Sequence, residues 1–113
     1  MNALRVAYEA TAPRIPGVGF DAFAAAFADA DITPVCVNDE CVGAILVKGC
    51  EVHACVMPHV RGRWVSRKLI KVLLDVVGKY GRAETVATTA DGVEFVKRLG
   101  FVPVGNRWIM YGC

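Results

Sequence analysis

Residues 56–69, VMPHVRGRWVSRKL, join the apolar end of a strand to a basic, amphipathic helix through a proline and an Arg-Gly turn. Backbone N–H groups in the first turn of a helix have no intrahelical partner, and the helix dipole adds positive charge there. Such a strand-to-helix turn is suited to hold a phosphate or pyrophosphate. We therefore expect the main-chain N–H groups of about residues 61–66 to bind an anion. The Ser66 hydroxyl and the charge of Arg61 or Arg67 would add to this site.

The length and composition limit what the rest of the chain can be. With 113 residues, the chain can bury one core, so we expect residues 1–113 to form a single domain. Hydrophobic residues make up 55% of it, yet no uninterrupted apolar run reaches the ~18 residues that a membrane helix needs. The start lacks a signal-peptide pattern, and the five cysteines include no Cys-x-x-Cys pair. We expect a cytoplasmic protein with reduced thiols and no membrane partner.

Hydrophobic periodicity predicts the element order β-α-β-β-β-α-β-α-β-β. The strands are expected at residues 4–8, 33–37, 42–48, 51–57, 84–88, 101–104 and 107–111, and the helices at about 21–31, 63–80 and 91–99. The three strands from 33 to 57 should form an antiparallel meander with a hairpin turn at residues 38–40. The helix at 63–80 should cross over so that its flanking strands are parallel. The predicted fold is α/β (α+β), with a mixed, mostly antiparallel sheet flanked by helices.

This order and the residues of the turn resemble the GNAT N-acetyltransferase superfamily, whose sheet splits between its fourth and fifth strands to admit acetyl-CoA. The acyl-CoA signature of the family, Arg/Gln-x-x-Gly-x-Gly/Ala, follows a strand that often ends in Val-x-Pro, as residues 56–58 do. Arg61 falls on its first position, and Trp64 and Ser66 fall on its two small positions. Leu-Gly-Phe at residues 99–101, where a helix ends, is a second hallmark of the family.

The resemblance implies an acyl-CoA-dependent N-acetyltransferase that moves acetyl from acetyl-CoA to an amine acceptor, which is a protein or a small molecule. It places acetyl-CoA at the strand end and the turn, on Val56, Met57, Arg61, Gly62, Arg63, Trp64, Val65, Ser66 and Arg67. The family usually has two helices before its first hairpin, and this chain has room there for an abbreviated version only.

Acetyl transfer to an amine needs a base that faces the cleft. On the strand before the turn, alternation places residues 52, 54 and 56 on one face, which we expect to be core, and Glu51 and His53 on the other. Histidine titrates near neutral pH, so His53 is our first candidate for the base, and Glu51 is the alternative. A surface charge at the strand end is the favoured interpretation of Glu51. An equally weighted alternative makes His53 a half-buried sheet residue that is hydrogen-bonded to a neighbour.

The leaving thiolate needs a proton, which many family members supply from a tyrosine on the helix before Leu-Gly-Phe. Here Phe95 stands in that neighbourhood, and a phenyl ring has no proton to give. Tyr111 is therefore the candidate acid, with Tyr80 or water as alternatives. Trp64, Ser66 and Phe95 also favour a second class of function, a catalytically silent GNAT-fold module.

Short phage-encoded GNAT-like proteins are similar to this chain in size and in the sequence Arg-Gly-Arg-Trp at residues 61–64. That similarity implies a structural or host-interaction module of a phage, in the host cytoplasm or in the virion. The apolar segment 108–111 would supply a pairing edge for a homodimer or for a virion or host protein, although core burial explains it equally well.

A third class of function is nucleic-acid binding. Although the net charge is only +2, five cations lie within residues 61–71 and form a local basic patch. Helices that abut a sheet routinely carry solvated lysines, and no aromatic stacking pattern accompanies these cations, so we rank this class below acyl-CoA binding. The cysteines form no metal-binding knuckle, and we expect no zinc site. Cys36 and Cys41 should face each other across the hairpin.

Overall fold

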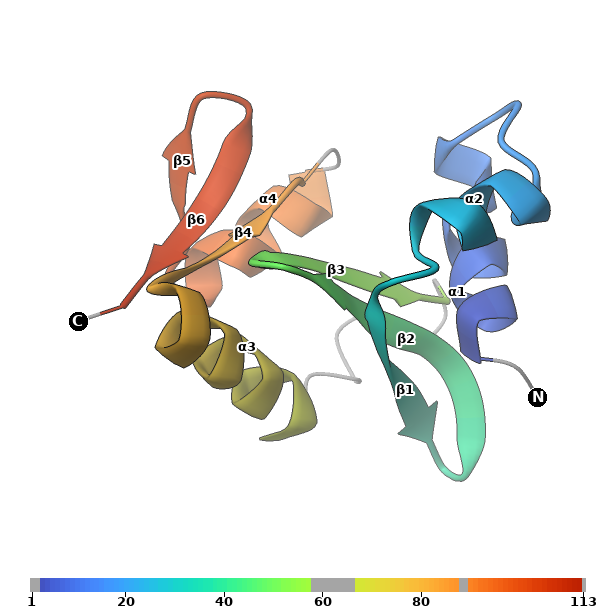
Figure 1. Ribbon diagram of the computed structural model, residues 1–113, viewed down its shortest axis with the longest axis horizontal. Helices are drawn as coiled ribbons and strands as arrows, with labels where there is room; N and C mark the ends of the chain where they lie inside the picture. Colours follow the sequence, from blue (N-terminus) through green and yellow to red (C-terminus); the bar gives the residue numbers. More distant parts are fainter. Residues whose placement is uncertain (1–2, 58–66, 88–89, 113) are drawn as a thin grey trace.

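The structure is a computed structural model that describes residues 3–57, 67–87 and 90–112 (Figure 1). Its elements are α1 (Ala3–Thr11), the short 3-10 helix η1 (Ala12–Arg14), α2 (Phe20–Ala26), β1 (Asp31–Val37), β2 (Glu40–Lys48), β3 (Glu51–Val56), α3 (Arg67–Tyr80), β4 (Arg82–Thr85), α4 (Ala90–Arg98), β5 (Val102–Val104) and β6 (Arg107–Tyr111). The strands form one sheet in the order β1-β2-β3-β4-β6-β5. All neighbours are antiparallel except β3 and β4. The expected mixed, mostly antiparallel sheet with flanking helices is confirmed.

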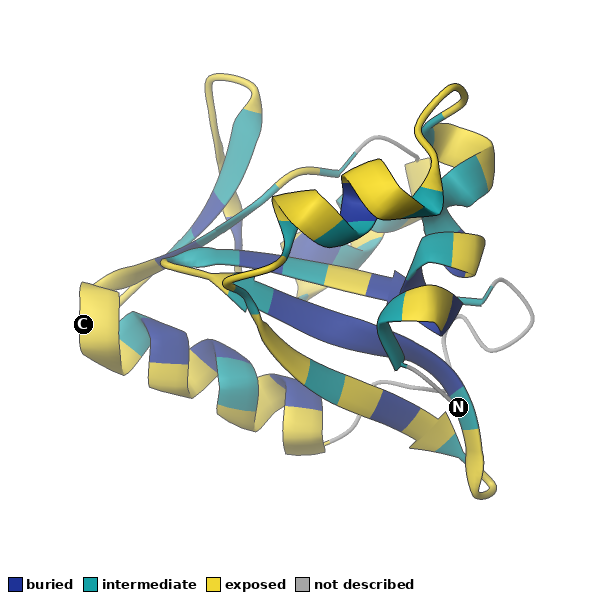
Figure 2. Cartoon of the chain, turned by 45° about the vertical axis from the view of Figure 1, so that its right-hand side comes forward, coloured by how far each residue is buried: buried dark blue, intermediate teal, exposed yellow. Residues whose placement is uncertain are grey.

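Helices cover the two faces of the sheet unequally (Figure 1). On one face, α3 and α4 bury the larger core, which includes Leu69, Leu73 and Val96. On the other face, α1 and α2 cover only the β1–β3 half, with Ala7 and Phe23 over the sheet. Strand β2 is buried along most of its length because it lies under both layers (Figure 2). No described helix is long and apolar enough to span a membrane.

The predicted first strand at residues 4–8 is wrong, because these residues lie in helix α1. Val6, Ala7 and Ala10 are the buried residues of this helix, and their spacing is that of one helical face. A short apolar run fits both the strand period and the helix period, so the sequence alone did not separate them. The small side chains of Ala7 and Ala10 let α1 lie close on the sheet. Two α-helices, rather than a strand and a helix, therefore precede the first described hairpin.

The predicted β1–β2 hairpin is confirmed. Asn38 and Asp39 have φ angles of 52° and 66°, and two positive φ values at the centre of a two-residue loop are the geometry of a type I′ turn. Asparagine and aspartate tolerate this left-handed conformation better than most residues. The register pairs Cys36 with Cys41, so these two free thiols face each other as expected.

Strands β3 and β4 run parallel but stay together over a short distance only. Their register holds one pair, Glu51 with Glu84, and the Glu84 N–H donates to the Cys50 carbonyl over 2.8 Å. Beyond this pair the two strands diverge (Figure 1). The Met57 N–H donates to the Val42 carbonyl on β2 and so points away from β4. Along a strand, the N–H groups of successive residues point to opposite sides, so those of residues 54 and 56 point the other way. The N–H groups of Ala54 and Val56 therefore point into the split between β3 and β4.

Candidate functional site

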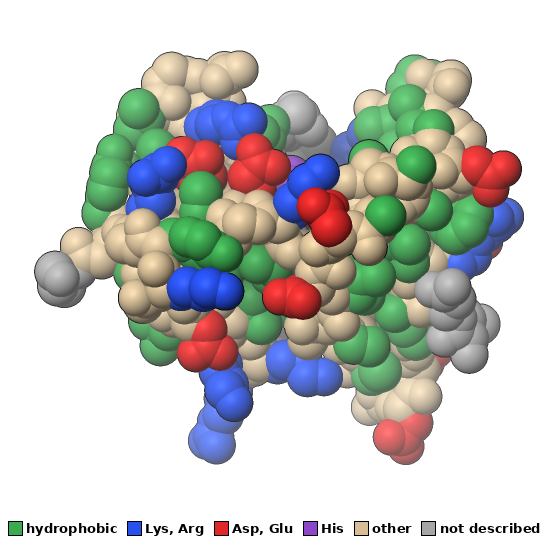
Figure 3. Space-filling view, viewed as in Figure 1, with side chains coloured by type: hydrophobic (Ala, Val, Ile, Leu, Met, Phe, Trp, Pro, Cys, Tyr) green, Lys and Arg blue, Asp and Glu red, His purple; other side chains and the backbone are tan. Residues whose placement is uncertain are grey.

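A cavity of about 290 Å³ lies in the split of the sheet. Its walls come from the end of α1, η1, β3, the end of β4, α3 and α4, and they are mostly apolar. The lining residues are Thr11, Arg14, Ile15, Val52, His53, Ala54, Cys55, Leu69, Leu73, Thr85, Val86, Ala87, Gly92, Phe95, Val96, Leu99 and Phe101. Figure 3 shows the surface hollowed between the end that carries α1 and α2 and the end that carries the β5–β6 hairpin. The cavity is close in volume to the smaller pockets that hold small ligands.

The β3 residues at this cavity differ in part from the sequence prediction. Val52 and Val56 belong to the core as expected, but Ala54, on the same face, is exposed because it borders the cavity. Cys55, on the opposite face, is buried under the layer of α1 and α2. Burial raises the pKa of the Cys55 thiol, so it is neutral and a weak nucleophile. The expectation of one core face and one cleft face on β3 is therefore wrong at these two residues.

His53 lines the cavity in a half-buried position. Its ring meets the Phe27 ring edge-on, with 5.5 Å between centroids, and its Nε2 lies 3.8 Å from Glu51 Oε2. Burial lowers the pKa of His53 below its ordinary value of 6.5, while the Glu51 carboxylate opposes the shift and the Arg107 charge adds to it. An imidazole with a lowered pKa is neutral at pH 7 and has a lone pair that can accept a proton. If the ring proton faces Glu51, that lone pair is on Nδ1.

Glu51 is part of a chain of charges along the start of the split. Arg107 Nη1 donates to Glu51 Oε1 over 2.7 Å and lies 3.8 Å from Glu84 Oε2. Arg82 Nε in turn donates to Glu84 Oε1 over 3.1 Å. Arg107 holds the Glu51 carboxylate beside His53 and fixes its orientation. The sequence pointed to Glu51 and His53 but missed Arg107 and Glu84, because nothing local pairs residues 56 positions apart.

The lowered pKa of His53 makes folding stability depend on pH. Since the pKa is lower in the folded than in the unfolded protein, the neutral ring stabilises the fold above pH 6.5, and this contribution is lost as the pH falls below 6.5 towards the folded pKa. We expect the unfolding free energy of the wild type to fall in this range more steeply than that of His53→Gln, which has no titrating ring. Urea titrations on both sides of pH 6.5 measure this difference. Parallel pH profiles for the two proteins would contradict the assigned shift.

The other candidate residues lie in several places. Val56 is buried at the end of β3, Met57 follows it, and Arg67 begins α3 as an exposed residue. The turn itself, residues 61–66, lies outside the described residues, so its anion site stays a prediction. Tyr111, the candidate acid, is 59% exposed at the end of β6 and is not among the described residues that line the cavity. Phe95 does line it.

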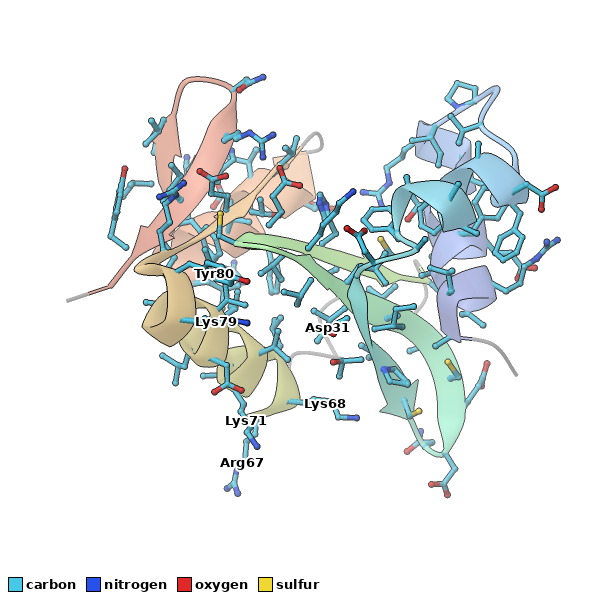
Figure 4. All side chains as sticks on the ribbon, in the orientation of Figure 1. Asp31, Arg67, Lys68, Lys71, Lys79 and Tyr80 are labelled. Carbon is cyan, nitrogen blue, oxygen red and sulfur yellow. The ribbon has the colours of Figure 1, made fainter. Side chains whose placement is uncertain are left out.

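The described cations of the basic patch do not act as one group. Arg67 and Lys71 point away from the sheet, whereas Lys68 reaches towards β1 (Figure 4). Lys68 Nζ donates to the Pro34 carbonyl over 3.1 Å. Strand β1 is at the edge of the sheet, and Pro34 within it lacks a backbone N–H. Because Lys68 already binds the Pro34 carbonyl, this edge is poorly suited to pair with another strand. Lys68 therefore stabilises the sheet edge.

Strand β6 lies between β4 and β5, and β5 pairs with residues 107–109 of β6. Trp108 and Met110 pack on the larger core and Ile109 is buried, whereas Tyr111 is exposed. Core burial, one of the two sequence expectations for the segment 108–111, therefore holds for residues 108–110. The other expectation, a pairing edge for a homodimer, stays a prediction.

Within residues 3–57, 67–87 and 90–112, no three His, Cys, Asp or Glu side chains come together in a way that could hold a metal ion. Comparisons of the chain with protein families, with curated proteins and with solved structures find no match. The candidate function therefore rests on the geometry of the split and on the residues around it.

Proposed function

We propose that this chain is a GNAT-type N-acetyltransferase that binds acetyl-CoA in the split between β3 and β4 and transfers its acetyl group to an amine. One observation carries this proposal. The sheet opens after a single parallel pair, Glu51 with Glu84, and the cavity in the opening has the ionisable side chain of His53 in its wall.

The arrangement of the elements supports a GNAT-type fold. Two α-helices precede the first hairpin, and a helix connects the two parallel strands that border the split. In the family the split lies between the fourth and fifth strands, and here it lies between the third and fourth of the described sheet. The strand numbers differ by one because residues 4–8, which we expected to form the first strand, lie in helix α1 instead.

The residues of the cavity fit an acyl-CoA. Its mostly apolar walls suit the acyl group and the pantetheine arm. The N–H groups of Ala54 and Val56 point into the split, where they can donate to the amides of the arm or to the thioester carbonyl. Arg67 is the first residue of α3. It directly follows residues 61–66, the turn that we expect to bind the pyrophosphate together with Arg67.

His53 is the base in the proposed reaction. Its neutral imidazole accepts a proton from the amine while the amine nitrogen forms a bond to the thioester carbonyl carbon. The bond from that carbon to sulfur then breaks, and the proton held by His53 passes through water to the thiolate, which returns His53 to its neutral form. Glu51, held by Arg107, orients the imidazole and stabilises the positive charge that it gains. The acetylated amine and coenzyme A leave the site.

Calorimetry with coenzyme A tests the binding step. We expect saturable binding at or below millimolar ligand, and an absence of heat at that concentration would remove the enzyme proposal. A thiol-release assay with acetyl-CoA and amines then tests the chemistry. We expect His53→Gln to lower the transfer rate by about a hundredfold or more, because it removes the base. The same variant should bind coenzyme A as the wild type does, and an unchanged rate would exclude His53 as the base.

A second candidate is a GNAT-fold module that binds coenzyme A without turnover, or that serves as a phage structural or host-interaction protein in the host cytoplasm or in the virion. Phe95 favours it, because this side chain borders the cavity without a proton to donate, and the described cavity wall includes no tyrosine. The thiol-release assay distinguishes the two candidates. Coenzyme A binding without thiol release for any amine supports the module, whereas release that depends on His53 supports the enzyme.

A further inference from the structure

Among the described residues that line the cavity, one is an arginine. Arg14, at the end of η1, lines the cavity beside Thr11 and Ile15, on the side covered by α1. The other described lining residues are apolar or uncharged, apart from His53, whose ring is neutral at pH 7. A cationic side chain in a mostly apolar wall favours a ligand with a group of opposite sign.

Arg14 has no carboxylate partner among the residues that the structure describes. Arg5, Arg82 and Arg107 each form an ion pair, whereas Arg14 forms none in the described residues. The undescribed positions include no Asp or Glu. A guanidinium presents a planar fork of donors that matches a carboxylate with two parallel hydrogen bonds. The side chain is exposed, so this fork is available to a ligand that enters the cavity.

Arg14 shares this cavity with the proposed base. Arg14 lines the wall at the end of η1, and His53 lines the wall formed by β3. Cys55, two residues after His53 on the same face of β3, also lines the cavity. An acceptor with an amino group and a carboxylate on the same carbon presents one group to His53 and the other to Arg14.

The wall around Arg14 has a second polar side chain. Thr11 Oγ1 is buried next to the Cys55 thiol and opposes the rise in the pKa of that thiol, and beyond the thiol it has no hydrogen-bond partner among the described residues. Thr11 and Arg14 are three residues apart and border the same part of the cavity. This wall is thus richer in hydrogen-bond donors than the walls formed by α3 and α4.

We propose that the acceptor is a small amine with a carboxylate on the carbon that carries the amino group, that is, a free amino acid, and that Arg14 binds this carboxylate. This inference rests on the proposed acetyltransferase function and specifies its substrate class. In the reaction Arg14 makes and breaks no covalent bond. It positions the amine for attack on the thioester carbonyl while His53 takes the proton.

Matched pairs of acceptors test the inference in the thiol-release assay, for example phenylalanine with 2-phenylethylamine and glycine with methylamine. We expect the wild type to have a kcat/KM at least tenfold higher for the amino acid of a pair. Arg14→Gln should lower kcat/KM for the amino acid by about tenfold to a hundredfold, because a charge-assisted hydrogen bond is lost. It should leave the rate with the amine that lacks a carboxylate unchanged, and Arg14→Lys should recover part of the loss.

Coenzyme A calorimetry separates the ways in which the inference can fail. Coenzyme A binding by Arg14→Gln should equal that of the wild type. Weaker binding would mean that Arg14 meets a phosphate of the cofactor, and it would overturn the inference. Transfer without preference for the carboxylate, or no transfer to any amino acid by a protein that binds coenzyme A, would overturn it and leave the binding proposal standing. No coenzyme A binding by the wild type would remove both.

Discussion

Gly43→Ala should destabilise this protein more than any other single methyl addition that we can identify in it. A Cβ at position 43 would lie 2.0 Å from the Cys55 carbonyl oxygen and 2.7 Å from the Val56 Cα. Both contacts are with the backbone of β3, which cannot move aside without disturbing the centre of the sheet. Overpacking typically costs about 1–3 kcal/mol, and a backbone clash of this kind should lie at or above about 3 kcal/mol. The midpoint of thermal unfolding should fall by roughly 10 °C or more.

Gly78→Ala is the matched control for this prediction. Gly78 lies in α3, and a Cβ there would meet no atom within 4 Å. Alanine favours a helix over glycine, so this variant should gain about 0.5–1 kcal/mol. Urea titrations of the three proteins measure the contrast. Equal stabilities for Gly43→Ala and the wild type would mean that β2 and β3 do not approach as closely as the structure has them.

Ala54→Phe should weaken coenzyme A binding at least tenfold while it leaves the fold intact. The Ala54 side chain is exposed to the cavity, on the face of β3 that also carries the buried Val52 and Val56. A phenyl ring there would occupy a large part of the cavity of about 290 Å³, in the space that the proposed pantetheine arm needs. We expect the dissociation constant to rise at least tenfold, which is a loss of about 1.4 kcal/mol or more.

Ala25→Phe makes the same substitution on an exposed residue of α2 and should leave coenzyme A binding unchanged. Urea unfolding of both variants verifies that they are folded, and Ala54→Leu provides a smaller side chain in case the phenyl ring disturbs the sheet. Wild-type affinity in a folded Ala54→Phe protein would show that the ligand does not enter the split, and the proposed function would then need another site.

Local patterns predicted much of the fold, because the interactions that shape those elements lie close together in the chain. The turn at Asn38 and Asp39, the helix that ends at Tyr80 and the hairpin around Gly105 all agree with the structure. Each depends on residues a few positions apart, on helical periodicity or on a residue that accepts a positive φ. The expected strand at residues 4–8 failed because its short apolar run suits either period, and packing against the sheet selected the helix.

The candidate site was predictable only in part. Alternation along β3 placed Glu51 and His53 on one face, and the structure has them 3.8 Å apart. The same alternation assigned Ala54 to the core, but the divergence of β4 leaves this residue facing a cavity. Arg107 and Arg14 joined the site from distant parts of the chain, and no local pattern distinguished them from other surface arginines.

The sequence by itself determined the strand, turn and helix order from residue 31 onward, and it singled out Glu51 and His53. It did so because side-chain periodicity and turn chemistry act over a few residues. Only the tertiary structure decided that β3 and β4 separate after one pair, that Arg107 holds Glu51 beside His53, and that Arg14 lines the same cavity as His53. These features arise from packing between segments far apart in the chain, where a cavity forms because two strands diverge and the helices on either side do not fill the gap.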